Sequence, residues 1–191
     1  MSDYHIREAT EDDRERVIKL VSKMWSEDIA PRYERFYVSN PHGRALTWLA
    51  IETGTGETAG CTSIFPRRVI VDGRERMGSI GGDCYIEPRM RRRGIATALH
   101  KESLAGMREH GIEFMYGPPN PSNLHALVKA GSRLVTSFKR WVRPLAGSAV
   151  YRAAFTRAPS KLEARIASLP LRVLDRLTRA DARGFTLEEV T

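Results

Sequence analysis

The chain has 191 residues, of which 41% are hydrophobic and 28% are charged, and its formal net charge is +8. These proportions are close to the averages of globular proteins, so they exclude a disordered or fibrous chain, and the length is enough for one buried core and an appendage. The positive charge favours an anionic partner, and charge alone does not choose among nucleic acid, acidic lipid and a phosphorylated cofactor.

Strand and helix patterns alternate along most of the chain. In chain order they predict a strand at residues 4–9, a helix after Thr10, a helix at 31–37, strands at 45–53, 58–71 and 77–86, a helix at 95–110, a strand at 113–117, a helix at 121–130 and a strand at 133–142. A turn at residues 54–57 separates two of the strands, so we expect these two to be antiparallel neighbours.

The chain changes character after Leu145. Residues 145–191 contain eight Lys or Arg and five acidic residues, and apolar residues recur every three or four positions on either side of Pro170. We therefore divide the chain into a domain at residues 1–146 and a basic, amphipathic, helical tail at residues 147–191. The apolar face of the tail needs a partner, and packing on the same chain or on the second subunit of a homodimer is favoured over a membrane surface.

The segment 91–96, Arg-Arg-Arg-Gly-Ile-Ala, lies between a strand that stops before Pro88 and the start of a helix. A diphosphate needs several backbone N–H groups that point at one spot, and the first turn of a helix supplies them together with the positive end of its dipole. Gly94 has no Cβ, so phosphates can approach the main chain there. Taken alone, the same segment also fits a solvated basic loop or a nucleic-acid-binding patch.

With its flanks, this segment resembles the signature of the GNAT superfamily of N-acetyltransferases, in which a strand and Pro precede (Arg or Gln)-x-x-Gly-x-(Gly or Ala) at the start of a helix. The order of elements over residues 3–143 is similar as well. The resemblance implies an α/β (α+β) fold with a mixed central sheet flanked by helices. It also implies that the loop binds the pyrophosphate of acetyl-CoA and that the preceding strand pairs with the pantetheine arm. The residues so implicated are Cys84, Tyr85, Ile86, Arg91, Arg92, Arg93, Gly94, Ile95 and Ala96.

A second segment, Gly-Pro-Pro-Asn at residues 117–120, precedes a helix that ends at Gly131. It resembles the second cofactor motif of the superfamily, in which an Asn opens the helix beside the pantetheine arm. The resemblance therefore adds Asn120 to the cofactor-binding residues. A simple helix cap explains Asn120 equally well.

The usual catalytic residues of the superfamily are replaced in this sequence. Many members protonate the departing thiolate with a Tyr seven residues after the motif Asn, and this position holds Leu127. The positions expected for a base on the fourth strand hold Ile80 and Gly82, which cannot take a proton. Asp83 is the nearest ionisable candidate, because the glycine pair before it could form a β-bulge that turns the strand towards the acceptor. A structural carboxylate, with proton transfer through water, is the competing interpretation.

The sequence therefore predicts an N-acetyltransferase that moves an acetyl or other acyl group from acetyl-CoA to a primary amine by direct attack. The candidate acceptors are small molecules such as amino sugars. The competing hypothesis is a catalytically weakened regulatory or nucleic-acid-binding module. No aromatic residues are interleaved with the Arg cluster, so we expect no nucleic-acid partner.

Two further expectations concern chemistry and location. Cys61 and Cys84 are far apart in sequence, which favours buried thiols and no metal site. The apolar stretches are much shorter than the roughly 20 residues that span a bilayer, so no transmembrane helix is expected. The N-terminal residues lack the pattern of a secretory signal, and we expect a cytoplasmic protein.

Overall fold

The computed structural model describes residues 3–25, 29–137, 160–163, 165–166 and 168–169. The chain divides into two units, residues 1–135 and 136–191, and the account below concerns the first. The domain boundary predicted near residue 147 lies outside the described residues. In the predicted tail, the described residues from 161 to 169 are helical, Ser160 before them is not, and the remaining residues of the tail lie outside the described residues.

The first unit is built on a five-stranded sheet whose strands follow the chain order from one edge to the other. The strands are β1 (Tyr4–Glu8), β2 (Leu46–Glu52), β3 (Thr58–Val71), β4 (Arg74–Ile86) and β5 (Phe114–Tyr116). The first four strands are antiparallel to their neighbours, whereas β5 runs parallel to β4. The predicted mixed sheet is confirmed, and so is the antiparallel pair of strands on either side of residues 54–57.

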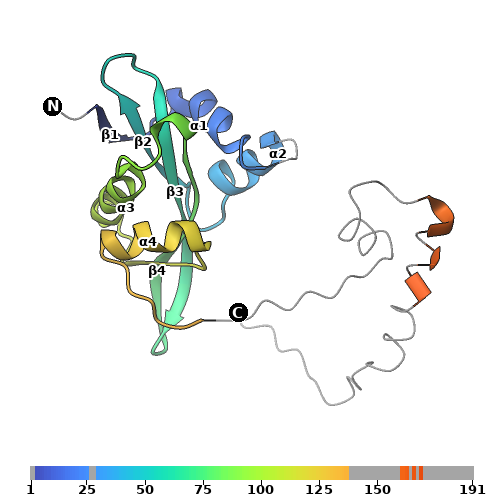
Figure 1. Ribbon diagram of the computed structural model, residues 1–191. Coiled ribbons are helices and arrows are strands. Elements are labelled where there is room, and N and C mark those ends of the chain that lie inside the picture. The colour runs from blue at the N-terminus through green and yellow to red at the C-terminus, as the bar shows by residue number, and fades with distance from the viewer. Residues whose placement is uncertain (1–2, 26–28, 138–159, 164, 167, 170–191) are drawn as a thin grey trace. The chain divides into compact units, whose positions relative to one another are not determined.

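Helices cover both faces of this sheet, with α1 and α2 on one face and α3 and α4 on the other (Figure 1). The helices are α1 (Arg14–Val21), α2 (Ile29–Tyr33), α3 (Ile95–Gly106) and α4 (Pro121–Ala130), with the 3₁₀ turns η1 (Glu11–Asp13) and η3 (Pro88–Met90) and the π-helical turn η2 (Glu34–Val38). Alternation along β2 explains why both faces need a cover. Leu49 packs with the apolar residues of α1, and its neighbour Trp48 packs with those of α3.

The turn between β3 and β4 is tighter than predicted, so β4 begins at Arg74 rather than near residue 77. Asp72 and Gly73 have φ angles of 50° and 72°. Two successive residues with positive φ form the type I′ turn, whose twist matches that of an antiparallel hairpin. Val71 and Arg74 consequently pair directly, and the register is constant from this turn to the pair of Ser63 and Gly82.

The predicted strand at residues 133–142 is wrong in the part that the structure describes, since residues 133–137 have no regular secondary structure. Leu134 and Val135 are 68% and 90% exposed. Side chains that stay this exposed gain little from a place in a sheet, so apolar burial does not favour strand pairing here. Residues 138–142 lie outside the described residues.

Candidate active site

β4 and β5 pair over only three residues each. The parallel contact joins residues 78–80 of β4 to the whole of β5, and β4 then continues to Ile86. On the side that faces β5, residues 81–86 of β4 therefore have no strand partner among the described residues. This stretch contains Cys84, Tyr85 and Ile86, whose main-chain groups on that side are free of a sheet ladder.

The loop after β4 turns through two residues in the left-handed region before α3 begins. Arg92 has a φ angle of 63° and Gly94 has a φ angle of 77°. Left-handed residues in such a loop turn nearby N–H groups towards one side, an arrangement that binds anions. A Cβ built on Gly94 would have no atom within 4 Å, so the space in front of its main chain is open.

Gly94 is also the N-cap residue of α3, and no side chain caps this helix. The first backbone N–H groups of a helix have no acceptor within it, and the first intrahelical bond here runs from Ala98 N to Gly94 O, at 3.0 Å. The N–H groups at the start of α3 thus point into the open space together with the positive end of the helix dipole.

A depression of about 200 Å³ lies over this helix start. Its lining residues come from the end of β4, from the loop and from the first turn of α3. They are Ile86, Met90, Arg91, Arg92, Gly94, Ile95, Ala96 and Thr97. The structure therefore brings six of the predicted cofactor residues around one hollow. Cys84, Tyr85, Arg93 and Asn120 do not line it, and neither does Asp83.

The arginines of the loop have different surroundings. Arg91 Nε donates to the carbonyl of Ile86 at 3.1 Å, and Arg93 pairs with Asp3 at 3.2 Å. In the part of the chain that the structure describes, the Arg92 side chain has no hydrogen-bond or ion-pair partner, so its guanidinium is free to bind an anion.

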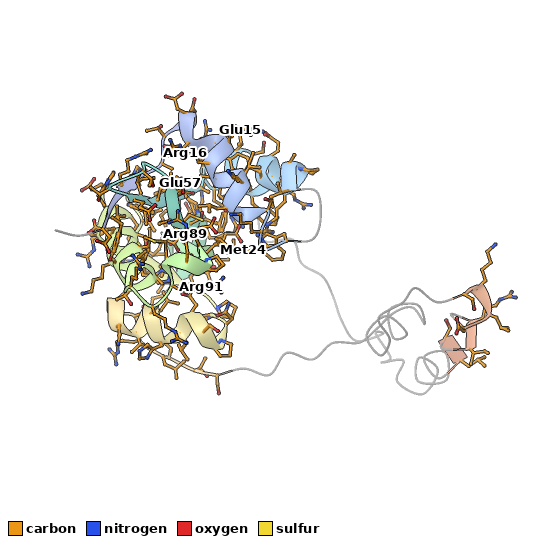
Figure 2. The ribbon with its side chains drawn as sticks, turned by 45° about the horizontal axis from the view of Figure 1, so that its top comes forward. Glu15, Arg16, Met24, Glu57, Arg89 and Arg91 are labelled. Atoms are coloured by element: carbon orange, nitrogen blue, oxygen red, sulfur yellow. The ribbon has the colours of Figure 1, made fainter. Side chains whose placement is uncertain are left out.

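Arg89 precedes this loop, and its guanidinium is already paired with carboxylates of the β2–β3 hairpin. It donates to Glu52 and to Glu57, at 2.7 Å in each case. Arg89 and Glu57 are labelled near each other in Figure 2. Both acceptors are carboxylates on the β2–β3 hairpin, so Arg89 ties this hairpin to η3. Its charge is neutralised locally and contributes little to an anion site over α3.

Asn120 is the N-cap residue of α4, and its Oδ1 accepts a hydrogen bond from Asn123 N at 2.8 Å. The helix-cap interpretation of Asn120 is therefore confirmed, while contact with a cofactor stays a prediction. Leu127 lies on the same helix and is half-buried, and it offers no proton donor.

His100 on α3 is buried and contacts Asn123 on α4 through its side chain. It is 3% exposed, and its Nε2 lies 2.9 Å from Asn123 Oδ1. Because the Asn oxygen can only accept, Nε2 carries the proton, and Nδ1 is buried with no partner among the described residues. Burial lowers the pKa of His100 below its usual value of 6.5, and the bond to Asn123 opposes this in part.

The buried histidine predicts a loss of stability in mild acid. A pKa that is lower in the folded chain makes the unfolded chain bind more protons, so the stabilisation is fully present above pH 6.5 and is lost as the pH falls towards the folded pKa. Urea unfolding at pH 7.5 and 5.5 should show a smaller pH effect in His100→Gln than in the wild type. The exposed His125 provides the control variant His125→Gln. An equal pH effect in all three proteins would contradict the prediction.

Asp83 lies in a β-bulge, one residue beyond the glycine pair that was expected to form it. A single residue of β3, Thr62, lies opposite both Asp83 and Cys84 of β4. Asp83 has a φ angle of 47°, which is uncommon for a residue other than glycine and is most accessible to Asn and Asp. The bulge turns the Asp83 side chain towards the face that α1 and α2 cover, where it is only 4% exposed.

Three side chains donate to the Asp83 carboxylate. Arg32 Nη2 lies 3.0 Å from Oδ1 and 3.2 Å from Oδ2, and Tyr37 Oη lies 2.8 Å from Oδ2. Trp25 Nε1 lies 3.3 Å from Oδ1. The sequence does not indicate any of these three donors, because they lie 46 to 58 positions before Asp83 and no local pattern links them to it.

The bond from Tyr37 to Asp83 ends a chain of buried hydroxyl groups. Tyr37 Oη lies 3.2 Å from Ser63 Oγ, which lies 2.9 Å from Thr47 Oγ1. Burial, together with the negative charge of Asp83, holds the pKa of Tyr37 well above its usual range. Tyr37 therefore stays protonated and is a lasting donor to Asp83.

Neither cysteine is suited to nucleophilic attack. Burial raises the pKa of Cys84 to about 11, and it raises the pKa of the fully buried Cys61 further. A thiolate is the reactive form of cysteine, so both thiols are inert near neutral pH. This leaves no cysteine for a covalent acyl intermediate on the protein.

Comparisons with known proteins agree with this architecture. The model of the "Acetyltransferase (GNAT) domain" family matches residues 5–129. The chain therefore belongs to the GNAT acetyltransferase family, and it is an acyltransferase by family. A search of curated protein sequences found no match. None of the described helices has both the length and the hydropathy needed to cross a membrane.

Solved structures share the fold at low sequence identity. A predicted acetyltransferase from Clostridium acetobutylicum, solved with acetyl-CoA, has a TM-score of 0.58 and 16% identity, over 74% of this chain and 95% of its own. Glucosamine-6-phosphate N-acetyltransferase from Arabidopsis thaliana has a TM-score of 0.56 and 13% identity, over 74% and 100%. An aminoglycoside 6'-N-acetyltransferase from Acinetobacter baumannii has a TM-score of 0.55 and 19% identity, over 74% and 99%.

Proposed function

We propose that this protein transfers an acetyl group from acetyl-CoA to the primary amine of a small molecule. The observation that carries the proposal is the uncapped start of α3, where the open space at Gly94 and the free Arg92 guanidinium adjoin the unpaired edge of β4. A structural neighbour was solved with acetyl-CoA, and two others are named as acetylating glucosamine 6-phosphate and aminoglycosides. These names support an amino sugar or a similar small amine as the acceptor.

The residues present fit the pyrophosphate of acetyl-CoA. The N–H groups of the first turn of α3 have no acceptor in the helix, and the space that a Cβ of residue 94 would fill is empty. In the proposal these N–H groups bind the phosphate oxygens, and Arg92 adds a positive charge next to them. The main chain of residues 84–86 would pair with the pantetheine arm along the free edge of β4.

Acetyl-CoA would supply the thioester, whose acyl carbon is the electrophile. The bond from the amine nitrogen to the acetyl carbon forms as the carbon–sulfur bond breaks, and the amine proton passes to Asp83 or to water. The departing sulfur takes its proton from solvent, since Leu127 cannot donate one. Asp83 must first give up one of its present donors, because both carboxylate oxygens are engaged.

Two measurements test this function. We expect acetyl-CoA to raise the melting temperature, and a panel of amines that includes amino sugars and aminoglycosides should release free thiol from acetyl-CoA above the rate of hydrolysis without amine. The competing regulatory or nucleic-acid-binding function predicts a salt-dependent shift of DNA or RNA with no stabilisation by acetyl-CoA. That second pattern would overturn the proposal.

A further inference from the structure

The guanidinium of Arg32 lies in a small site formed by the Asp83 carboxylate and by two aromatic rings, those of Trp25 and Phe36, which form its walls. The central carbon of this guanidinium lies 4.1 Å from the centroid of the Trp25 ring and 4.8 Å from that of Phe36. Aromatic faces attract cations electrostatically, and the carboxylate adds a full negative charge. The site therefore has the composition of one that binds an ammonium or guanidinium ion.

Arg32 fits this site incompletely. The same nitrogen, Nη2, contacts both oxygens of Asp83, whereas a well-fitted Arg–carboxylate pair uses two nitrogens in parallel. The Nε of Arg32 is buried without a partner among the described residues, which is unfavourable for a polar donor. A primary ammonium is a compact charge with three rotatable donors, so it could satisfy the carboxylate without leaving a buried donor unpaired.

The site opens to solvent on the side of Arg32 and Trp25. The Asp83 side chain is 4% exposed, that of Arg32 is 27% exposed, and Trp25 is 45% exposed. Tyr37 is buried on the inner side, where the hydroxyl chain holds it. Arg32 can therefore swing outward while Tyr37 keeps the carboxylate in place.

We infer that Arg32 is an internal occupant of the acceptor's cation site, and that the acceptor binds as an alkylammonium ion that displaces Arg32 from Asp83, Trp25 and Phe36. The exchange replaces one cation by another, so the charge of the site is conserved. The inference rests on the acetyl transfer proposed above. It narrows the acceptor to amines that carry a flat or apolar group beside the ammonium, because two rings form the walls.

The test uses 2-phenylethylammonium as the probe and the indole N–H signal of Trp25 in the ¹⁵N-labelled full chain as the readout, assigned with Trp25→Phe. We expect a saturable shift with the ammonium in the wild type and none with 2-phenylethanol, which has nearly the same shape and no charge. In Arg32→Gln the competitor is gone, so the probe should bind about tenfold tighter or more. Asp83→Asn should abolish binding.

Equal or weaker binding by a folded Arg32→Gln would overturn the inference, as would equal shifts with the ammonium and the alcohol. If Arg32→Gln does not fold, Phe36→Leu replaces it, since this variant keeps the pair of Arg32 and Asp83 and the Trp25 indole signal but loses the other aromatic ring. Binding of the probe that is at least about fivefold weaker than in the wild type would then support the inference, and unchanged binding would overturn it.

Stabilisation by acetyl-CoA is measured on each variant as a separate readout. Acetyl-CoA binding without binding of the ammonium probe would reject only the cation site. The absence of acetyl-CoA binding by the wild type would reject the proposed function itself, whatever the probe does.

Discussion

Gly94→Glu is expected to abolish the stabilisation of the protein by acetyl-CoA. The new carboxylate would stand in the open space before the first N–H groups of α3 and would repel the phosphates. At a ligand concentration of about 100 times Kd, the wild type should gain about 2.7 kcal/mol, and the variant should gain none. The measurement is the melting temperature with and without acetyl-CoA, compared within each protein.

Gly73→Glu is the matched control for this variant. Gly73 has a φ angle of 72°, close to the 77° of Gly94, and a Cβ there would also meet no atom within 4 Å. Each substitution places the same charge on a left-handed residue and should lower folding stability by about 1–2 kcal/mol. Only the change at Gly94 should affect the ligand. Undiminished binding by Gly94→Glu would remove the main support for the proposed cofactor site.

Asp83→Asn is expected to lower turnover by about 10²–10⁴-fold while acetyl-CoA binding is kept, because a positioned proton acceptor contributes about this much. Asn has nearly the same shape and tolerates the φ angle of 47°, so the bulge should persist. The defect should shrink as the pH rises, since more of the amine then arrives neutral and the missing acceptor matters less. Turnover and KM are measured from pH 6 to 10 with an amine found in the panel.

Asp72→Asn is the control for this change. Among the described residues, Asp72 is the second aspartate with a positive φ angle, 50°, and it is exposed in the turn of the same hairpin. The control should leave turnover, KM and acetyl-CoA binding unchanged. Should Asp83→Asn keep the wild-type turnover across the pH range, Asp83 would be structural, and proton transfer through water would be the better account.

The order of helices and strands could be predicted from the sequence because each element carries its own local signal. Apolar periodicity separates helix from strand, and the turn residues of the β2–β3 hairpin identify antiparallel neighbours. The loop over α3 could be predicted for the same reason. The end of a strand, a Pro, three Arg and a Gly lie within residues 86–94, so a single segment indicated the hollow that the structure forms there.

The surroundings of Asp83 were decided by the tertiary structure alone. Its donors, Arg32, Tyr37 and Trp25, precede the β2–β3 hairpin in the chain, whereas Asp83 follows it. None of the three follows a pattern that points to Asp83. The sequence by itself determined a GNAT fold and a glycine loop at the start of α3, because those features are local. The occupied cation site could not be predicted, because it depends on how α2 packs against β4 and on a bulge that aims one carboxylate inward.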